Sequence, residues 1–237
     1  MIHVRHEEAF GGIGRTTAWT LSVVLGAWFA VACGLAGADW FTAQLGQPPL
    51  ALLAAVVVPV IVFAAMYAFS ARFRTFVRAG DPEWLTILQS WRILGGVFLV
   101  LLSFGLLPAV FALPAGFGDV AIGLTAPFIA RAFANRGPRQ ASRLFVIWQL
   151  LGILDLVVAV GTGGSLRAVP GVLSDWAGSE QMVAMGRLPL SLVPTFAVPL
   201  FVILHLASLA QLRAQLNGTA SGSDASAPRP TLTTTRS

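Results

Sequence analysis

Six apolar stretches, each long enough for about 20 residues of helix, decide what this chain can fold into. They lie near residues 17–37, 49–70, 91–112, 114–132, 143–161 and 188–212. A helix of about 20 apolar residues crosses a hydrocarbon core of roughly 30 Å. Only helices and closed barrels satisfy every backbone hydrogen bond in lipid, and barrels have shorter, alternating segments. The pattern therefore predicts an all-α, polytopic membrane bundle of six transmembrane helices.

Composition agrees with lipid as the main solvent of the chain. Of the 237 residues, 56% are hydrophobic and 11% are charged, whereas a soluble domain has about 25% charged residues. We expect a transmembrane domain over 17–212, preceded by a short polar segment, 1–16. Residues 213–237 are rich in Ser, Thr, Gly and Pro, a composition typical of a disordered tail.

The arginines predict the orientation of the chain in the membrane. All fifteen basic residues are arginine. If the N-terminus is cytoplasmic, thirteen of them lie on the cytoplasmic side, including Arg92 at the start of the third helix, and only Arg167 and Arg187 lie outside. Such asymmetry follows the positive-inside rule. We therefore expect a multi-pass inner-membrane protein with both termini in the cytoplasm, and we attribute the net charge of +5 to topology rather than to a nucleic-acid partner.

Several kinds of chemistry are excluded by missing residue types. Without a lysine, no Schiff base with retinal or pyridoxal phosphate can form. The single cysteine, Cys33, leaves no disulfide within the chain and no multi-cysteine metal site. His3 and His6 are terminal, so His205 is the one histidine of the predicted bundle and a bis-histidine haem is not expected. The sequence predicts neither a metal nor a cofactor.

Two carboxylates, Asp119 and Asp155, stand inside the fourth and fifth apolar stretches. A charge within the bilayer costs several kcal/mol, so it normally faces a partner, a cavity or a pathway. At about 1.5 Å per helical residue, both carboxylates lie roughly 7–9 Å below the outer surface. They approach this level from opposite chain directions, which predicts a shared site.

Other polar residues are candidates for the same site because of their helix faces. Gln149 lies two helical steps of three residues from Asp155, and Thr195 and His205 share a face of the last helix. Counting from the outer surface places His205 about 25 Å deep, too far from the carboxylates for direct contact. Arg187, at the outer mouth, is placed to pair with one of them.

Prolines in the apolar stretches add acceptors at this depth. Pro59, Pro108, Pro194 and Pro199 each leave a carbonyl four residues earlier without its usual donor, and in lipid that carbonyl needs another partner. Together with the carboxylates, these carbonyls predict a polar pocket that opens outward and suits a cation, a protonated amine or hydrogen-bond donors. The two carboxylates would titrate as a coupled pair, which links ligand binding to proton exchange.

Three functions remain open on these observations. The first is binding or transport of a small molecule or cation. The second is an accessory or scaffold subunit, in a homo- or hetero-oligomer, whose intramembrane polar residues only fix helix packing. The third is an intramembrane enzyme acting on a lipid or prenyl compound, which is the least favoured because neither a paired-acid motif nor a nucleophile with a nearby base is found. The bilayer is a partner in all three.

Overall fold

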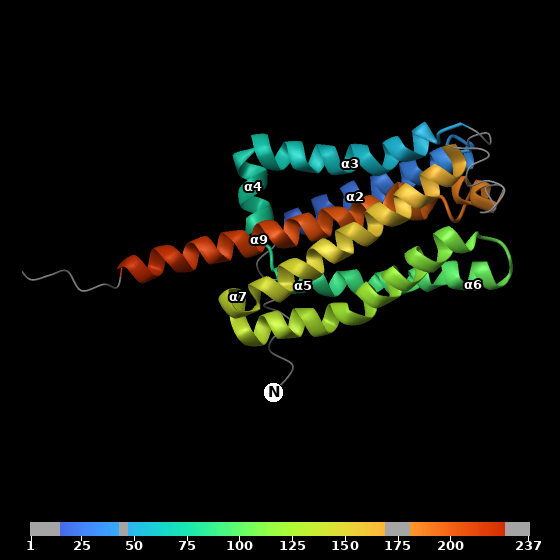
Figure 1. The fold of residues 1–237 in the computed structure, drawn as a ribbon. Coiled ribbons are helices and arrows are strands. Elements are labelled where there is room, and N and C mark those ends of the chain that lie inside the picture. Colours follow the sequence, from blue (N-terminus) through green and yellow to red (C-terminus); the bar gives the residue numbers. More distant parts are fainter. Residues whose placement is uncertain (1–14, 43–46, 169–180, 226–237) are drawn as a thin grey trace, which may run out of the picture.

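The computed structural model describes residues 15–42, 47–168 and 181–225, and within these ranges it contains helices and turns but no strand (Figure 1). Residues 1–14, 43–46, 169–180 and 226–237 lie outside the described residues, so what the sequence predicts for them stays a prediction. The elements in chain order are α2 (Arg15–Gly37), α3 (Leu50–Phe69), α4 (Ala71–Arg78), α5 (Pro82–Leu88), the 3₁₀ helix η1 (Gln89–Gly96), α6 (Val97–Ser103), α7 (Ala109–Ala168), η2 (Gln181–Gly186), the π-helical η3 (Val193–Ala197) and α9 (Val198–Ala225).

Five helical segments of the described chain are long and apolar enough to cross a membrane. They are Thr16–Gly37, Leu50–Phe69, Pro82–Ser103, Ala109–Ser165 and Val193–Asn217. The expected all-helical class is confirmed, and the apolar helices are compatible with a multi-pass membrane protein.

The longest helix, α7, folds back on itself at Gly137, which has φ 74° and ψ 169°. Glycine adopts positive φ without a steric penalty, so it can reverse the chain there. The two arms then run side by side (Figure 1). The rings of Phe133 and Phe145 meet at 4.5 Å between centroids, and Trp148 Nε1 donates a hydrogen bond to Thr125 Oγ1 over 2.9 Å.

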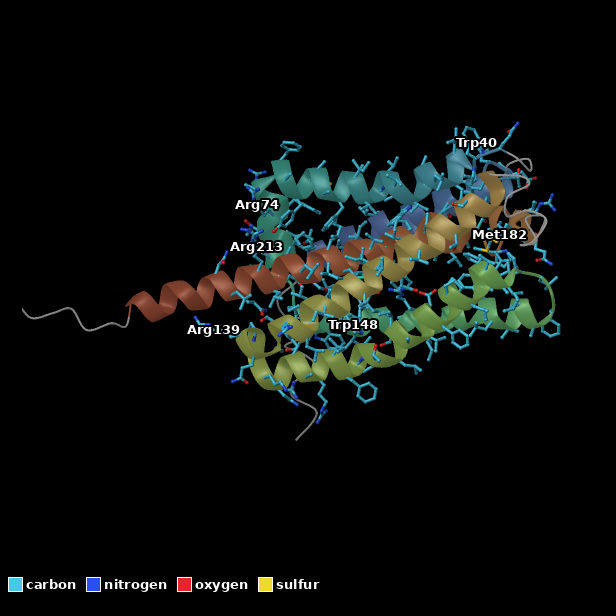
Figure 2. All side chains as sticks on the ribbon, in the orientation of Figure 1. Trp40, Arg74, Arg139, Trp148, Met182 and Arg213 are labelled. Atoms are coloured by element: carbon cyan, nitrogen blue, oxygen red, sulfur yellow. The ribbon has the colours of Figure 1, made fainter. Side chains whose placement is uncertain are left out.

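The bundle has two ends, which we name by what they hold. The Gly105 end holds the turn between α6 and α7, the start of α3 and the helix η2 (Figure 1). The arginine-rich end holds α4, the Gly137 turn and the far part of α9. Figure 2 labels Arg74, Arg139 and Arg213 at this end.

The third apolar segment differs from its prediction in a way that matters for the site. A helix over 91–112 was expected, but the helical run starts at Pro82 and ends at Ser103. Asp81 caps it by accepting a hydrogen bond from the Glu83 N–H over 2.8 Å, and proline suits the first helical position. Arg92 therefore does not lie at the membrane surface as predicted. It lies inside the bundle, only 1% exposed.

The last apolar segment begins later and ends later than expected. Residues 187–191 form a bend and turns, η3 follows after Leu192, and α9 runs from Val198 through Ala225. The part of the predicted tail before residue 226 is thus helical, and α9 extends beyond the other helices at the arginine-rich end (Figure 1).

Candidate functional site

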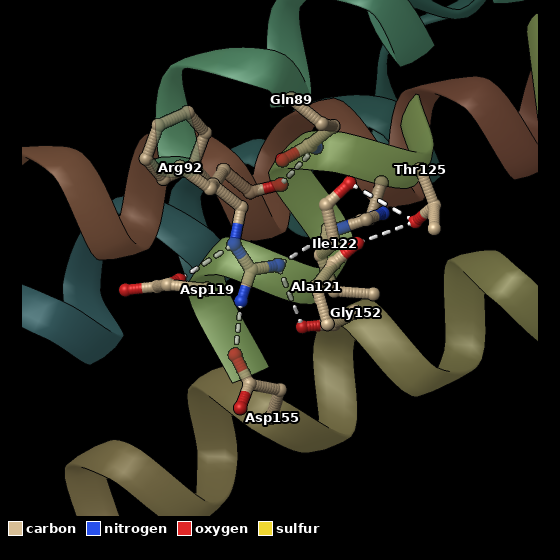
Figure 3. Close-up of polar contacts among 10 residues, drawn as sticks. Gln89, Arg92, Asp119, Ala121, Ile122, Thr125, Gly152 and Asp155 are labelled. Atoms are coloured by element: carbon tan, nitrogen blue, oxygen red, sulfur yellow. Dashed lines mark hydrogen bonds and ion pairs between the residues drawn. The ribbon is translucent and has the colours of Figure 1, made fainter. Parts of the chain in front are cut away.

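Arg92 of η1 is the centre of a charged cluster between the two arms of α7. Its Nε donates to Asp119 Oδ1 over 2.7 Å, and its Nη2 donates to Asp155 Oδ2. Its Nη1 donates to the Gly152 carbonyl over 3.0 Å (Figure 3). The planar guanidinium group of arginine can donate hydrogen bonds to several partners in different directions, which the compact ammonium group of lysine does less well. The three partners hold a buried charge that would be very unfavourable if it were unpaired.

Glycines provide the space for this cluster. A Cβ atom at Gly95 would collide with the carboxylate of Asp119, and one at Gly118 would collide with the carboxylate of Asp155. These positions keep η1 and the arms of α7 close enough for one arginine to reach both acids, as small residues do at helix contacts in membranes.

His205 of α9 joins the cluster from the opposite side. Its Nε2 lies 3.2 Å from Arg92 Nη1. Because arginine only donates hydrogen bonds, this nitrogen of His205 must accept. The proton of the neutral ring is therefore on Nδ1, which donates to Gln149 Oε1. A Cβ at Gly152 would collide with the imidazole, so a glycine gives His205 its place as well.

From His205 the hydrogen bonds continue away from the charged groups, and each residue donates to the next one. Gln149 Nε2 donates to Thr86 Oγ1 over 3.1 Å, and the Thr86 hydroxyl donates to the Pro82 carbonyl over 2.7 Å. Each group from Arg92 to Pro82 thus has a defined donor or acceptor role. Thr86, Gln149 and His205 are all fully buried.

The structure places the predicted carboxylates together, but farther from the helix ends than expected. The first arm of α7 starts at Ala109 rather than near Pro114, and its second arm continues to Ala168 rather than ending near Gly161. At 1.5 Å per residue, Asp119 lies about 15 Å and Asp155 about 20 Å from these ends.

His205 was predicted to lie too far from the carboxylates for direct contact, and in the structure it reaches them through Arg92. Continuous helix begins only near Val193, so His205 lies about 18 Å from that point and shares the level of the acids. Arg92 makes the connection between them. Gln149, also predicted for the site, contacts it through His205.

Two predicted residues are not brought into the cluster. Thr195 is buried, but its hydroxyl donates to the Ser191 carbonyl of its own segment over 2.7 Å. Arg187 is exposed in the turn after η2. Arg92, not Arg187, pairs with the two carboxylates.

Sequence reasoning missed Arg92, Thr86 and Gln89. All three are buried, and they recur at every third position just before Gly95 and Gly96. Three-residue spacing is that of a 3₁₀ helix, which places residues i and i+3 in line. This spacing is the sequence signal for a shared buried face, whereas the neighbouring Trp91 favours a position at the membrane surface.

A cavity of about 50 Å³ lies between the cluster and the Gly105 end. Its walls are apolar, and they include Phe98, Phe111, Leu156 and Met182. Asp119 is the charged residue in the lining of this cavity. The carboxylate side chains of Asp119 and Asp155 are 14% and 15% exposed, whereas that of Arg92 is 0% exposed. This cavity differs from the predicted polar pocket, because its walls are apolar.

The cluster contains two acidic side chains and one basic side chain. Arg92 is the basic partner of both acids in the part of the chain that the structure describes, and His205 is neutral in the tautomer that its hydrogen bonds require. With both acids ionised, the net charge is therefore −1. Across the residues that the structure describes, no three His, Cys, Asp or Glu side chains are arranged so that they could hold a metal ion.

An all-helical chain with long apolar helices and a buried ionic cluster has the features of a membrane protein. The chain belongs to the family described as Domain of unknown function (DUF8737), whose model matches residues 49–213. This range runs from α3 into α9 and includes Arg92, both carboxylates and His205, whereas α2 lies outside it. No curated protein and no solved structure matches the chain.

Proposed function

We propose that this protein binds a small ligand with a cationic or hydrogen-bond-donating head in the cavity beside Asp119 and carries it across the membrane in exchange for a proton. The observation that carries the proposal is the sharing of one arginine by two carboxylates, one of which lines a cavity. Asp119, Asp155 and Arg92 would then form the binding site of a transporter.

The charge of the cluster supports a positive ligand. A net charge of −1 among apolar helices is unfavourable by several kcal/mol. One additional positive charge, either a proton or the head of a ligand, makes the cluster neutral. Asp119 is the acid that such a charge can reach from the cavity.

The cavity walls favour a ligand with an apolar body. A space of about 50 Å³ has room for a few water molecules or for a small alkyl group. Apolar walls offer no oxygen ligands, which strongly hydrated divalent cations require. A small primary alkylamine combines the required charge with a body that fits these walls.

In the proposed transporter the chain crosses the membrane six times, because each of the two arms of α7 forms one crossing. With Arg92 inside the bundle, twelve arginines remain on the predicted cytoplasmic side against two outside. Both termini are then cytoplasmic, the Gly105 end faces outward, and the cavity opens to the outer side of the inner membrane.

A scaffold role is the second candidate, and the completeness of the Arg92 bonding favours it. Nε, Nη1 and Nη2 of Arg92 all have partners, and these bonds tie η1 to both arms of α7 and to α9. In this role the cluster would only lock helices together, and no small ligand would bind.

Ligand-dependent thermal stability separates the two roles. Purified protein in detergent is heated with methylammonium, ethylammonium, propylammonium or butylammonium chloride, and with neutral alcohols of equal length. We expect stabilisation by an amine but not by the alcohols, and its loss in Asp119→Asn. Asp39→Asn is the matched control because Asp39 is exposed near the Gly105 end and distant from the cluster in the fold. No shift in the wild-type protein with any amine, Na⁺ or K⁺ would reject the proposal and favour the scaffold.

A further inference from the structure

Helix α9 carries a polar stripe between the Arg92 cluster and the arginine-rich end. His205, Ser208, Gln211 and Gln215 follow one another at intervals of three, three and four residues, so they lie on one helix face. The first three are at most 2% exposed. From His205 to Gln215 the stripe rises about 15 Å.

Neighbouring elements add polar groups to the same side of the cluster. Gln89 Nε2 donates to the Phe201 carbonyl over 3.1 Å, and Gln211 Nε2 donates to the Val77 carbonyl over 3.0 Å. These bonds place Gln89 near the cluster level of α9 and place Gln211 beside the end of α4. The polar groups therefore extend from Arg92 to the arginine-rich end, along the contact of α5 with α9.

Several buried oxygens in this region have no hydrogen-bond donor among the described residues. They are Oε1 of Gln89, Gln211 and Gln215, together with Oγ of Ser90. A buried acceptor without a donor costs about 1–3 kcal/mol, and native structures satisfy nearly all such groups with protein or with water. An amide oxygen can only accept hydrogen bonds, so the three glutamines require donors from outside the described residues, and water can supply them.

We propose that this stripe lines a hydrated passage, which takes water and small hydrogen-bond donors from the arginine-rich end up to His205. The inference rests on the proposed function, because it gives the Asp119 site a second access route on the side opposite the cavity. Transport requires that the site be reached from both faces of the membrane. The apolar cavity and the polar passage reach the Arg92 cluster from opposite ends of the bundle.

Accessibility of a thiol to Ag⁺ tests the passage without any ligand. Ser208→Cys is compared with Ala207→Cys in a Cys33→Ala background, because Ala207 is the adjacent residue, is also buried, and lies off the stripe. Each protein is treated with silver nitrate for increasing times, denatured, and labelled with a fluorescent maleimide that reports the remaining thiol. Size-exclusion chromatography confirms that both variants are folded.

We expect Ag⁺ to block Ser208→Cys at least about tenfold faster than Ala207→Cys, since an opening step of only about 1.4 kcal/mol already imposes a tenfold difference. Adding Gln211→Leu, which replaces an amide of the stripe by an apolar group, should slow the reaction of Ser208→Cys. Equal rates at the two positions, or no effect of Gln211→Leu, would overturn the passage. The amine-dependent thermal shift is measured on the same proteins, so a dry stripe with intact amine binding rejects the passage alone.

Discussion

Arg92 Nη1 lies 3.2 Å from His205 Nε2 and so decides which nitrogen of the histidine carries the proton. A protonated Nε2 would face a group that can only donate. The contact joins residues 113 positions apart in the chain. It makes the ionic cluster and the hydrogen-bonded chain toward Pro82 a single network.

The tautomer of His205 is the first prediction. In a protein with His3→Gln and His6→Gln, His205 is the one remaining histidine. We expect its ¹⁵N NMR signals to show a neutral ring with hydrogen on Nδ1, because Nε2 accepts from Arg92 and Nδ1 donates to Gln149. Hydrogen on Nε2 at neutral pH would contradict the described network. Gln149→Leu, which removes the acceptor of Nδ1, should change the spectrum and serves as an assignment control.

Arg92→Gln should be among the most destabilising single substitutions in the described chain. It leaves Asp119 and Asp155 buried without their common positive partner, and breaking a buried ion pair costs about 3–5 kcal/mol. Unfolding is measured by heating or by titration with a denaturing detergent. Arg213→Gln is the control, because Arg213 is exposed.

A second variant distinguishes charge from packing in this result. Asp119→Asn combined with Arg92→Gln leaves one carboxylate in place of two, so it should recover part of the lost stability. If Arg92→Gln costs no more than Arg213→Gln, the cluster does not hold the helices together.

Gly118→Ala should destabilise the protein even though it places a better helix former in a helix. Alanine normally stabilises a helix interior by about 1 kcal/mol relative to glycine. At Gly118 the new methyl group would collide with the Asp155 carboxylate, so we expect a lower melting temperature. Gly26→Ala in α2 is the control, because nothing lies within 4 Å of a Cβ there. A melting temperature for Gly118→Ala equal to or above that of Gly26→Ala would show that the arms of α7 have room to separate.

The orientation of the bundle is tested by thiol labelling of spheroplasts. Leu106 at the Gly105 end and Gln140 beside the Gly137 turn are both exposed. In a Cys33→Ala background, a membrane-impermeant maleimide should label Leu106→Cys in intact spheroplasts and label Gln140→Cys only after lysis. The reverse pattern would invert the predicted topology.

Much of the fold could be predicted from the sequence because lipid imposes a simple requirement on each apolar segment. The helical class followed from segment length alone, and the pairing of Asp119 with Asp155 in one site followed from their matched depth. Helix boundaries were harder to predict. A cap at Asp81 and turns before Val193 shifted the start of two helices, and the depths of Arg92 and His205 changed with them.

The central role of Arg92 was missed for a reason specific to charged residues in membranes. The same arginine satisfies the positive-inside rule at a surface or compensates acids in the interior. Its position in the chain, beside Trp91 and after a polar loop, favours the first interpretation. Three-residue spacing with Thr86 and Gln89 favours the second, and only packing against α7 and α9 decides between them.

Because α7 reverses at Gly137, the number of residues between this glycine and each acid determines whether the two acids meet. Asp119 and Asp155 stand eighteen residues before and after this glycine (119 to 137, and 137 to 155). Eighteen residues make five turns of a helix with 3.6 residues per turn. Each acid therefore lies on the same side of its arm as Gly137, and both lie at the same distance along the arms from this turn. Deleting one residue from either arm would rotate its acid by about 100° away from Arg92. Between Gly137 and each acid, the arms can therefore change in composition more easily than in length.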